Sequence, residues 1–329
     1  MLLSALVTAT LACSGGSYYA QSPGPAAPPA ATAAQSPARA EAQRPPAPTA
    51  SLPKQEGSVK FLVIGDTGTG DSRQRQVAEQ IVKAHASFPF EFAIMLGDNL
   101  YGSEGPSAYV KKFETPYKPL LDAGVKFYAT LGNHDEPAQR FYEPFNMGGK
   151  RYYTFTKGGT QVLGLGETDV EFFVLDSTYV TPEQIEWLKG ALEGSKAKWK
   201  IAYFHHPIYS SGEKHGSEED LQALVEPLFL QYGVDVVFSG HEHFYERLKP
   251  QKGIYYITQG AGAKLREGNI RAQSALTAKG FDTDRSFTLV EIVEDHMFFE
   301  TISRTGQVVD SGVMTRRGVN EERASTAAR

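Results

Sequence analysis

Short apolar runs separated by polar turns recur along most of this 329-residue chain. Five of the runs are nearly continuous, which is typical of strands buried on both faces of a sheet. They cover residues 59–65, 92–97, 125–132, 201–204 and 234–240. Stretches with helical spacing lie between some of them, at 73–85, 181–192 and 218–231, the last interrupted by Pro227. The pattern predicts a layered α/β sandwich with mixed sheets.

The later part of the chain has a different pattern, in which apolar and polar residues alternate. This alternation favours an antiparallel meander of strands. The segments are 254–258, 286–293, 297–303 and 308–313. We therefore predict one folded domain over residues 57–313, followed by a disordered polar tail over 314–329.

The first 56 residues lack a pattern that could build a core. Residues 1–18 are interpreted as a leader segment, because a short apolar stretch ends at small residues as in exported proteins. Residues 19–56 are rich in Ala and Pro, and we interpret them as a disordered linker. Cys13, the only cysteine, resembles the lipid-modified cysteine of bacterial lipoproteins, with an ordinary leader cysteine as the alternative. We expect export, either to the periplasm, to the cell surface as a lipoprotein, or as a secreted protein.

Charge and hydropathy narrow the range of partners. The formal net charge is -5, so no nucleic-acid partner is expected. No apolar run approaches the ~20 residues that a membrane-spanning helix needs. Membrane attachment is therefore expected only through a lipidated Cys13.

Polar residues capable of chemistry follow each of the five apolar runs. These residues are Asp66, Asp98, Asn133, His205 and His241. Ligand sites in α/β sheets form at the carboxyl ends of strands, so these side chains are expected to converge. Without a thiolate, this donor mix suits zinc, iron or manganese. In an extended segment His241 and His243 would face the same way and could each bind one of two neighbouring metals; core or surface histidines are the alternative.

The order of these motifs resembles that of the calcineurin-like metallophosphoesterase superfamily over about residues 60 to 250. The motifs are Gly65-Asp66-Thr67-Gly68, Gly97-Asp98-Asn99-Leu100-Tyr101, Gly132-Asn133-His134-Asp135, His205-His206-Pro207 and Gly240-His241-Glu242-His243. Tyr101, three residues after Asp98, resembles the ligand tyrosine of purple acid phosphatases, of the tartrate-resistant type; a packing tyrosine is the alternative. The resemblance implies a four-layer α/β/β/α sandwich of two mixed β-sheets flanked by helices.

The same resemblance implies a binuclear metal centre. Asp66, Tyr101 and His243 would bind Fe(III). Asn133, His205 and His241 would bind the second metal, which would be Fe(II), Zn or Mn. Asp98 would bridge the two metals. His205 is preferred to His206 as the ligand because the family places it two residues before the proline.

The resemblance also assigns the substrate side of the site. His134 would lie near the phosphate and either stabilise charge or protonate the leaving oxygen, with Asn133 beside it. His215 would bind the substrate, and a solvated loop histidine is its alternative. A tight turn at residues 260–264 carries Lys264, which could reach a substrate.

The function implied is hydrolysis of small-molecule phosphate monoesters by a hydroxide that two metals activate. Two alternatives stay open: a phosphodiesterase for cyclic nucleotides or phospholipid head groups, and a non-catalytic surface binding protein. The sequence does not define the oligomeric state or the physiological substrate.

Overall fold

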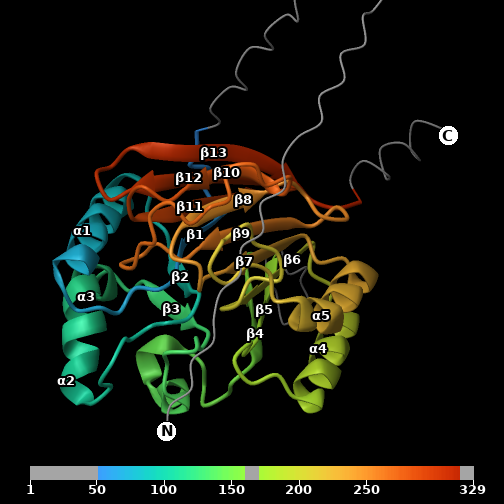
Figure 1. The fold of residues 1–329 in the computed structure, drawn as a ribbon, viewed down its shortest axis with the longest axis horizontal. Coiled ribbons are helices and arrows are strands. Elements are labelled where there is room, and N and C mark those ends of the chain that lie inside the picture. Colours follow the sequence, from blue (N-terminus) through green and yellow to red (C-terminus); the bar gives the residue numbers. More distant parts are fainter. Residues whose placement is uncertain (1–50, 160–169, 319–329) are drawn as a thin grey trace, which may run out of the picture. The chain divides into compact units, whose positions relative to one another are not determined.

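The computed structural model describes residues 51–159 and 170–318. Two mixed β-sheets pack face to face, with helices on both outer sides (Figure 1). In Figure 1, α1, α2 and α3 lie on one side of the sheets, and α4 and α5 on the other. The four-layer α/β/β/α sandwich expected from the sequence is confirmed.

The first sheet has six strands in the order β13-β12-β11-β1-β2-β3. Their bounds are Val59–Ile64 (β1), Phe92–Met95 (β2), Lys126–Ala129 (β3), Ser286–Val293 (β11), His296–Ser303 (β12) and Val308–Thr315 (β13). Strands β1, β2 and β3 are parallel to one another. Strands β11, β12 and β13 form an antiparallel meander that joins β1. The three predicted strands over 286–313 therefore pair as expected.

The second sheet has seven strands in the order β10-β8-β9-β7-β6-β5-β4. Their bounds are Tyr153–Lys157 (β4), Val170–Val174 (β5), Trp199–Phe204 (β6), Val236–Ser239 (β7), Tyr245–Leu248 (β8), Tyr255–Gln259 (β9) and Thr277–Phe281 (β10). Strand β9 pairs in parallel with β7 and antiparallel with β8, and it lies in a different sheet from the meander of β11, β12 and β13. Its predicted place in the antiparallel meander was wrong, because alternation along a strand does not specify its partner.

The helices begin and end at recognisable signals. Their bounds are Ser72–Ser87 (α1), Pro106–Tyr109 (α2), Thr115–Asp122 (α3), Pro182–Gly194 (α4) and Glu219–Tyr232 (α5). Asp71 caps α1 by accepting hydrogen bonds from two backbone amides, and Thr181 caps α4 ahead of its first-turn proline. Helix α5 continues through Pro227, which was expected to interrupt it, and ends at Gly233 with φ 75°.

Apolar side chains fill two layers of core. Between the sheets, Phe61 of β1 packs edge-on against Phe172 of β5 and Phe238 of β7, with ring centroids 5.4 and 6.3 Å apart. A second cluster joins the outer face of the second sheet to Leu188 of α4 and Phe229 of α5. The strand ends are thus held rigidly by packing on both faces.

Residues on both sides of the predicted range 57–313 contact the folded domain. Leu52 is buried, and the amides of Lys54 and Gln55 donate hydrogen bonds to Glu291 of β11. Strand β13 extends to Thr315, and Met314 is buried in the core. Leu52 and Met314, one beyond each predicted bound, thus pack in the core. The predicted leader, Cys13 and most of the predicted linker and tail lie outside the described residues.

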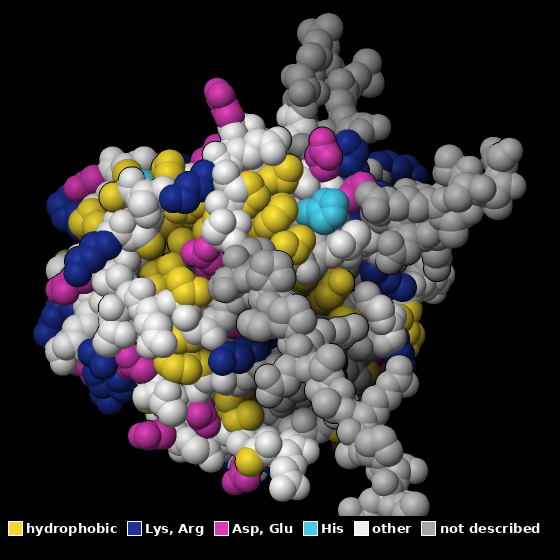
Figure 2. Space-filling model, turned by 90° about the horizontal axis from the view of Figure 1, so that it is seen from above, with side chains coloured by type: hydrophobic (Ala, Val, Ile, Leu, Met, Phe, Trp, Pro, Cys, Tyr) yellow, Lys and Arg dark blue, Asp and Glu magenta, His cyan; other side chains and the backbone are white. Residues whose placement is uncertain are grey.

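The surface above β13 carries mixed charge. Figure 2 views this end of the molecule from above, with hydrophobic side chains near its middle and side chains of both charge signs around them. Val308 and Val313 of the edge strand β13 are each 43% exposed. Among the described residues no helix is both long enough and apolar enough to span a bilayer.

Candidate metal centre

The parallel strands of both sheets deliver the candidate side chains to one edge. Asp66 follows β1, Asp98 lies three residues beyond β2, and Asn133 follows β3. In the facing sheet, His205 follows β6 and His241 follows β7. Because these strands run in parallel, their carboxyl ends meet, as expected from the sequence.

The backbone at these ends adopts conformations that non-glycine residues rarely take. Asp66, Asp98 and His241 have φ values of 57°, 50° and 67°. Such outliers cluster at functional sites, where the surrounding fold holds them in place. The expectation of an extended segment at His241 was wrong, since residues 241–244 form bends before β8 begins. At Gly132 an added Cβ would lie 2.3 Å from Asp98 Oδ1, so a glycine is needed there.

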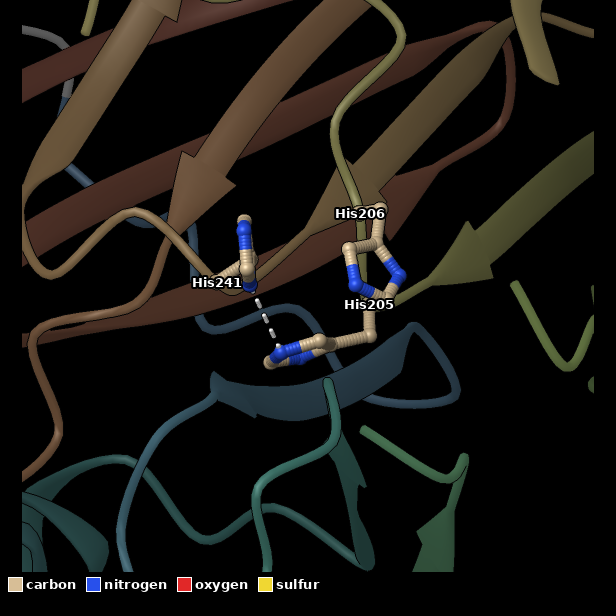
Figure 3. Close-up of side chains that lie close together, drawn as sticks. All are labelled: His205, His206 and His241. Atoms are coloured by element: carbon tan, nitrogen blue, oxygen red, sulfur yellow. Dashed lines mark hydrogen bonds between the residues drawn. The ribbon is translucent and has the colours of Figure 1, made fainter. Parts of the chain in front are cut away.

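Three donor atoms form a small triangle, which we call the amide-imidazole group. Asn133 Oδ1 lies 3.0 Å from His205 Nε2 and 3.0 Å from His241 Nδ1. The two ring nitrogens lie 3.2 Å apart, and Figure 3 shows the two rings meeting there. An amide oxygen and two imidazole nitrogens this close match the donor set of a divalent transition metal.

The hydrogen bonds of His205 fix its tautomer. Its Nδ1 lies 2.8 Å from the carbonyl oxygen of Leu96, which can only accept, so Nδ1 carries the proton. In the neutral ring Nε2 then presents its lone pair to the group, the usual arrangement for a metal-binding histidine. His206 lies next to this group in Figure 3, with Nδ1 2.9 Å from Ser177 Oγ. The preference for His205 over His206 as ligand stays a prediction.

A second set of donors, the carboxylate-phenol group, consists of Asp66, Tyr101 and His243. The Tyr101 hydroxyl donates to Asp66 Oδ1 at 3.0 Å and lies 3.4 Å from His243 Nε2. His243 Nε2 is also 3.4 Å from Asp66 Oδ1. Burial raises the pKa of Asp66, and burial with the nearby carboxylates raises the pKa of Tyr101. Without a metal the phenol therefore keeps its proton.

Asp98 lies between the two groups. Its Oδ1 accepts a hydrogen bond from the amide of His134 and is 3.4 Å from His205 Nε2. Its ligand atom also lies within 4.8 Å of those of Asp66 and His243. The other oxygen, Oδ2, is buried and has no hydrogen-bond partner among the described residues. A buried carboxylate oxygen without a partner is costly, and it fits a residue that shares a cation between two groups.

The imidazoles of His206, His241 and His243 are neutral at ordinary pH. Burial lowers the pKa of His241, and burial with the cation of Arg266 lowers the pKa of His243 to about 4. Burial and the neighbouring His205 lower the pKa of His206 to about 3. Metal ligation requires an unprotonated ring nitrogen, so this electrostatic environment suits a metal centre.

Two of the three predicted substrate residues, His134 and His215, lie at the solvent side. The exposed His134 ring is 5.0 Å from the Tyr101 ring, and the exposed His215 ring is 4.2 Å from that of His241. All nine candidate residues named from the sequence are thus brought together, and their roles stay predictions.

Two buried acids that support the site were missed by the sequence reasoning. Asp135 accepts hydrogen bonds from the backbone amides of Asn99, Leu100 and Gly132, and so ties together the loops after β2 and β3. Burial, with the charge of Asp98, raises the pKa of Asp135 to about 8. The sequence did contain a signal for Asp135, because this acid lies in the motif Gly132-Asn133-His134-Asp135 beside two candidate site residues.

Glu242 is the second of these acids, and its carboxylate reaches two loops at the site. It accepts from the amide of Gly216, beside His215, and from the side chains of Arg266 and Asn269. Its side chain is fully buried, between His241 and His243 in the sequence. Glu242 therefore fixes the loop that carries His215 relative to the candidate ligands.

The chain is similar to phosphatases of known family. Residues 59–245 match the family described as calcineurin-like phosphoesterase. Purple acid phosphatase 17 of Arabidopsis thaliana is 28% identical over 252 residues, covering 66% of this chain and 72% of that protein. Tartrate-resistant acid phosphatase type 5 of Oryctolagus cuniculus is 27% identical over 250 residues, covering 64% of this chain and 76% of that protein.

Solved structures share the fold at lower identity. The purple acid phosphatase PPD1 from yellow lupin superposes with a TM-score of 0.64 at 18% identity, covering 80% of this chain and 55% of that one. GAP50, described as the anchor in the inner membrane complex of Plasmodium, gives 0.68 at 20% identity, covering 83% of this chain and 95% of that one.

The chain belongs to the calcineurin-like phosphoesterase family, and it is a hydrolase that acts on phosphoric ester bonds. Its relatives include purple acid phosphatases and tartrate-resistant acid phosphatases, which confirms the resemblance found in the motifs.

Proposed function

We propose that this protein hydrolyses phosphate monoesters at a centre of two metal ions. The amide-imidazole group (Asn133, His205, His241) would hold one ion, and the carboxylate-phenol group (Asp66, Tyr101, His243) the other. The observation that carries the proposal is Asp98, whose buried Oδ2 has no partner among the described residues while both groups lie around it.

The donor sets suit two different ions. Phenolate and carboxylate are hard anionic donors, and they favour Fe(III) at the carboxylate-phenol group. One amide and two imidazoles give the other ion less neutralising charge, which suits Fe(II), Zn or Mn. When bound, the pair would supply positive charge to the phosphate and lower the pKa of a water molecule at the site.

The chain's own residues would orient the substrate and move a proton. His134 projects from the loop after β3, where its backbone amide is tied to Asp98. Its exposed imidazole is free to donate a proton to the leaving oxygen. His215, packed on the ring of His241, would contact a phosphate oxygen from the other side. Asn133 would combine metal binding with contact to the substrate.

The proposal is tested by metal analysis together with kinetics on an aryl phosphate. We expect two metal ions per chain and monoester hydrolysis that chelators abolish and re-addition of iron and zinc restores. Comparing rates on an aryl phosphate and on a methyl aryl phosphate ranks the monoesterase against the phosphodiesterase alternative. A fully metal-loaded protein without activity on either ester would support the non-catalytic alternative and contradict the proposal.

We also propose that the protein is exported and tethered through a lipid on Cys13, with a small-molecule phosphate ester as its substrate. The leader pattern and the position of Cys13 support this proposal. Mass spectrometry of the mature N-terminus checks it. A diacylglycerol mass on Cys13 is expected, and an unmodified cysteine in the mature chain would contradict the tether.

A further inference from the structure

Lys264 lies on the turn that leaves the carboxyl end of β9, next to β7 in the second sheet. The turn is tied to the candidate metal centre through its backbone. The amides of Ala263 and Lys264 donate to the carbonyl oxygen of Asp66 at 3.0 and 3.2 Å. Because β9 runs parallel to the strands that carry the candidate ligands, its loop emerges at the same edge of the sandwich.

The ammonium group of Lys264 lies over the Tyr101 ring, 4.1 Å from its centroid. It makes no hydrogen bond or ion pair with any residue in the ranges 51–159 and 170–318. The neighbouring cation Arg266 is, by contrast, paired with Glu242 at 3.2 Å. Lys112, close in sequence to Tyr101, is likewise engaged by the carbonyl oxygens of Tyr101 and Ser103. Among the described residues Lys264 is therefore a half-buried cation without an anionic partner.

Lys264 contacts the same tyrosine ring as His134, a residue proposed to contact the substrate. The Tyr101 ring is contacted by the ammonium of Lys264 and, at 5.0 Å, by the imidazole of His134. The hydroxyl of the same tyrosine is turned to Asp66. Oδ1 of Asp66 is thus engaged with the phenol, and the ammonium of Lys264 contacts the same ring as His134, the residue proposed to contact the phosphate.

We propose that Lys264 binds a non-reacting oxygen of the substrate phosphate and makes the site select monoesters over diesters. The inference rests on the proposed function. Near neutral pH a phosphate monoester carries a charge of about -1.5 to -2, because its second pKa is about 6. A diester carries a single charge and replaces one oxygen with an alkoxy group. A compact ammonium therefore gains more from the monoester, which carries more charge, than from the singly charged diester.

The test compares Lys264→Met, Lys264→Arg and the control Lys189→Met, a change on an exposed lysine of α4. Each is assayed in the metal-loaded enzyme with an aryl phosphate and with a methyl aryl phosphate. We expect Lys264→Met to lower kcat/KM for the monoester by roughly 10- to 100-fold, as for loss of a charged hydrogen bond. The diester value should change less than about threefold. Lys264→Arg should keep most of the preference for the monoester over the diester, and Lys189→Met should keep all of this preference.

Calorimetric binding of inorganic phosphate gives a second readout that needs no turnover. Its Kd should weaken by the same factor as the monoester kcat/KM in Lys264→Met, while binding of dimethyl phosphate stays unchanged. Equal losses for both esters would mean that Lys264 only supports Tyr101, and unchanged rates would mean that it contacts no substrate. Either result overturns the inference. Failure of the proposed function is a separate result, in which the wild-type protein binds no metal pair or hydrolyses no monoester.

Discussion

The amide of His134 donates a 3.0 Å hydrogen bond to Oδ1 of Asp98, while Oδ2 of the same carboxylate is buried without a hydrogen-bond partner among the described residues. The loop after β3 thereby holds the Asp98 side chain in one orientation. The Asp98 carboxylate lies where the two donor groups adjoin. Asp98 is for this reason the residue on which a two-metal centre depends most.

Replacing Asp98 with Asn should remove metal without unfolding the chain. Asn can still accept from the His134 amide, but its NH₂ group cannot bind a cation at the position of Oδ2. We expect metal content to fall below two ions per chain and phosphatase activity to fall at least about 100-fold. The metal-free variant should be as stable as the metal-free wild type, because a buried charge is lost.

Metal analysis and urea unfolding check the Asp98→Asn prediction. Asp122→Asn, on the exposed end of α3, is the matched control and should keep both metals. Full metal loading in Asp98→Asn would show that this carboxylate does not bridge two metal ions.

Tyr101→Phe should remove the visible absorption band of the iron-loaded protein and leave the fold intact. The variant loses the hydrogen bond to Asp66, which should cost roughly 1–3 kcal/mol in the free energy of unfolding of the metal-free protein. With Fe(III) bound, the wild type should show a visible phenolate-to-iron band that the variant lacks. Tyr117→Phe is the control, since the buried Tyr117 hydroxyl has no partner among the described residues. A band that survives in Tyr101→Phe contradicts Tyr101 as a ligand.

Glu242→Gln should loosen the loop that carries His215 and leave the metals in place. The glutamine NH₂ group would face donors from Arg266 or Asn269, and the partly buried Arg266 would lose its counter-ion. We expect a loss of roughly 1–3 kcal/mol in stability and a higher KM with two metals still bound. The exposed Glu267→Gln is the control. Unchanged KM together with unchanged stability would remove the positioning role of Glu242.

Asp235 should give the protein a pH dependence that is independent of the metals, because it lies at the opposite end of β7 from His241. Burial raises the pKa of Asp235 to about 6, above its ordinary value of 3.8. The folded state thus binds more protons than the unfolded state between these pH values, and the stability contribution of Asp235 falls as the pH rises through this window.

The measurement is urea unfolding of wild type and Asp235→Asn at several pH values. Between pH 4 and pH 7 the free energy of unfolding of the wild type should fall by up to about 3 kcal/mol relative to that of the variant. The substitution itself adds an offset that does not change with pH. A pH-independent difference between the two proteins would show that Asp235 titrates normally.

The five strand ends that carry Asp66, Asp98, Asn133, His205 and His241 were predictable from the sequence. Strands buried on both faces appear in the sequence as continuous apolar runs, and the polar residue that follows each run can be identified without a structure. The convergence of these ends followed from the parallel arrangement alone. The partner of β9 was not predictable, because alternation specifies a face of a strand and not its neighbour.

The supporting contacts of the site could not be read from the sequence, for a related reason. Glu242 and Lys264 meet loops that are distant in the sequence, at Gly216 and at Tyr101. Such contacts depend on how the two sheets pack against each other, and a local sequence pattern does not determine this packing. Helix α5 passes through Pro227 because Val225 and Phe229 are buried on either side of it, so packing offsets the lost hydrogen bond.

Crystal diffraction at the absorption edges of iron and zinc tests the two-metal centre most directly. The account predicts two anomalous peaks per chain, one among Asp66, Tyr101 and His243 and the other among Asn133, His205 and His241, with Asp98 in contact with both. A single peak, or peaks away from Asp98, in protein that is active on phosphate esters would contradict it.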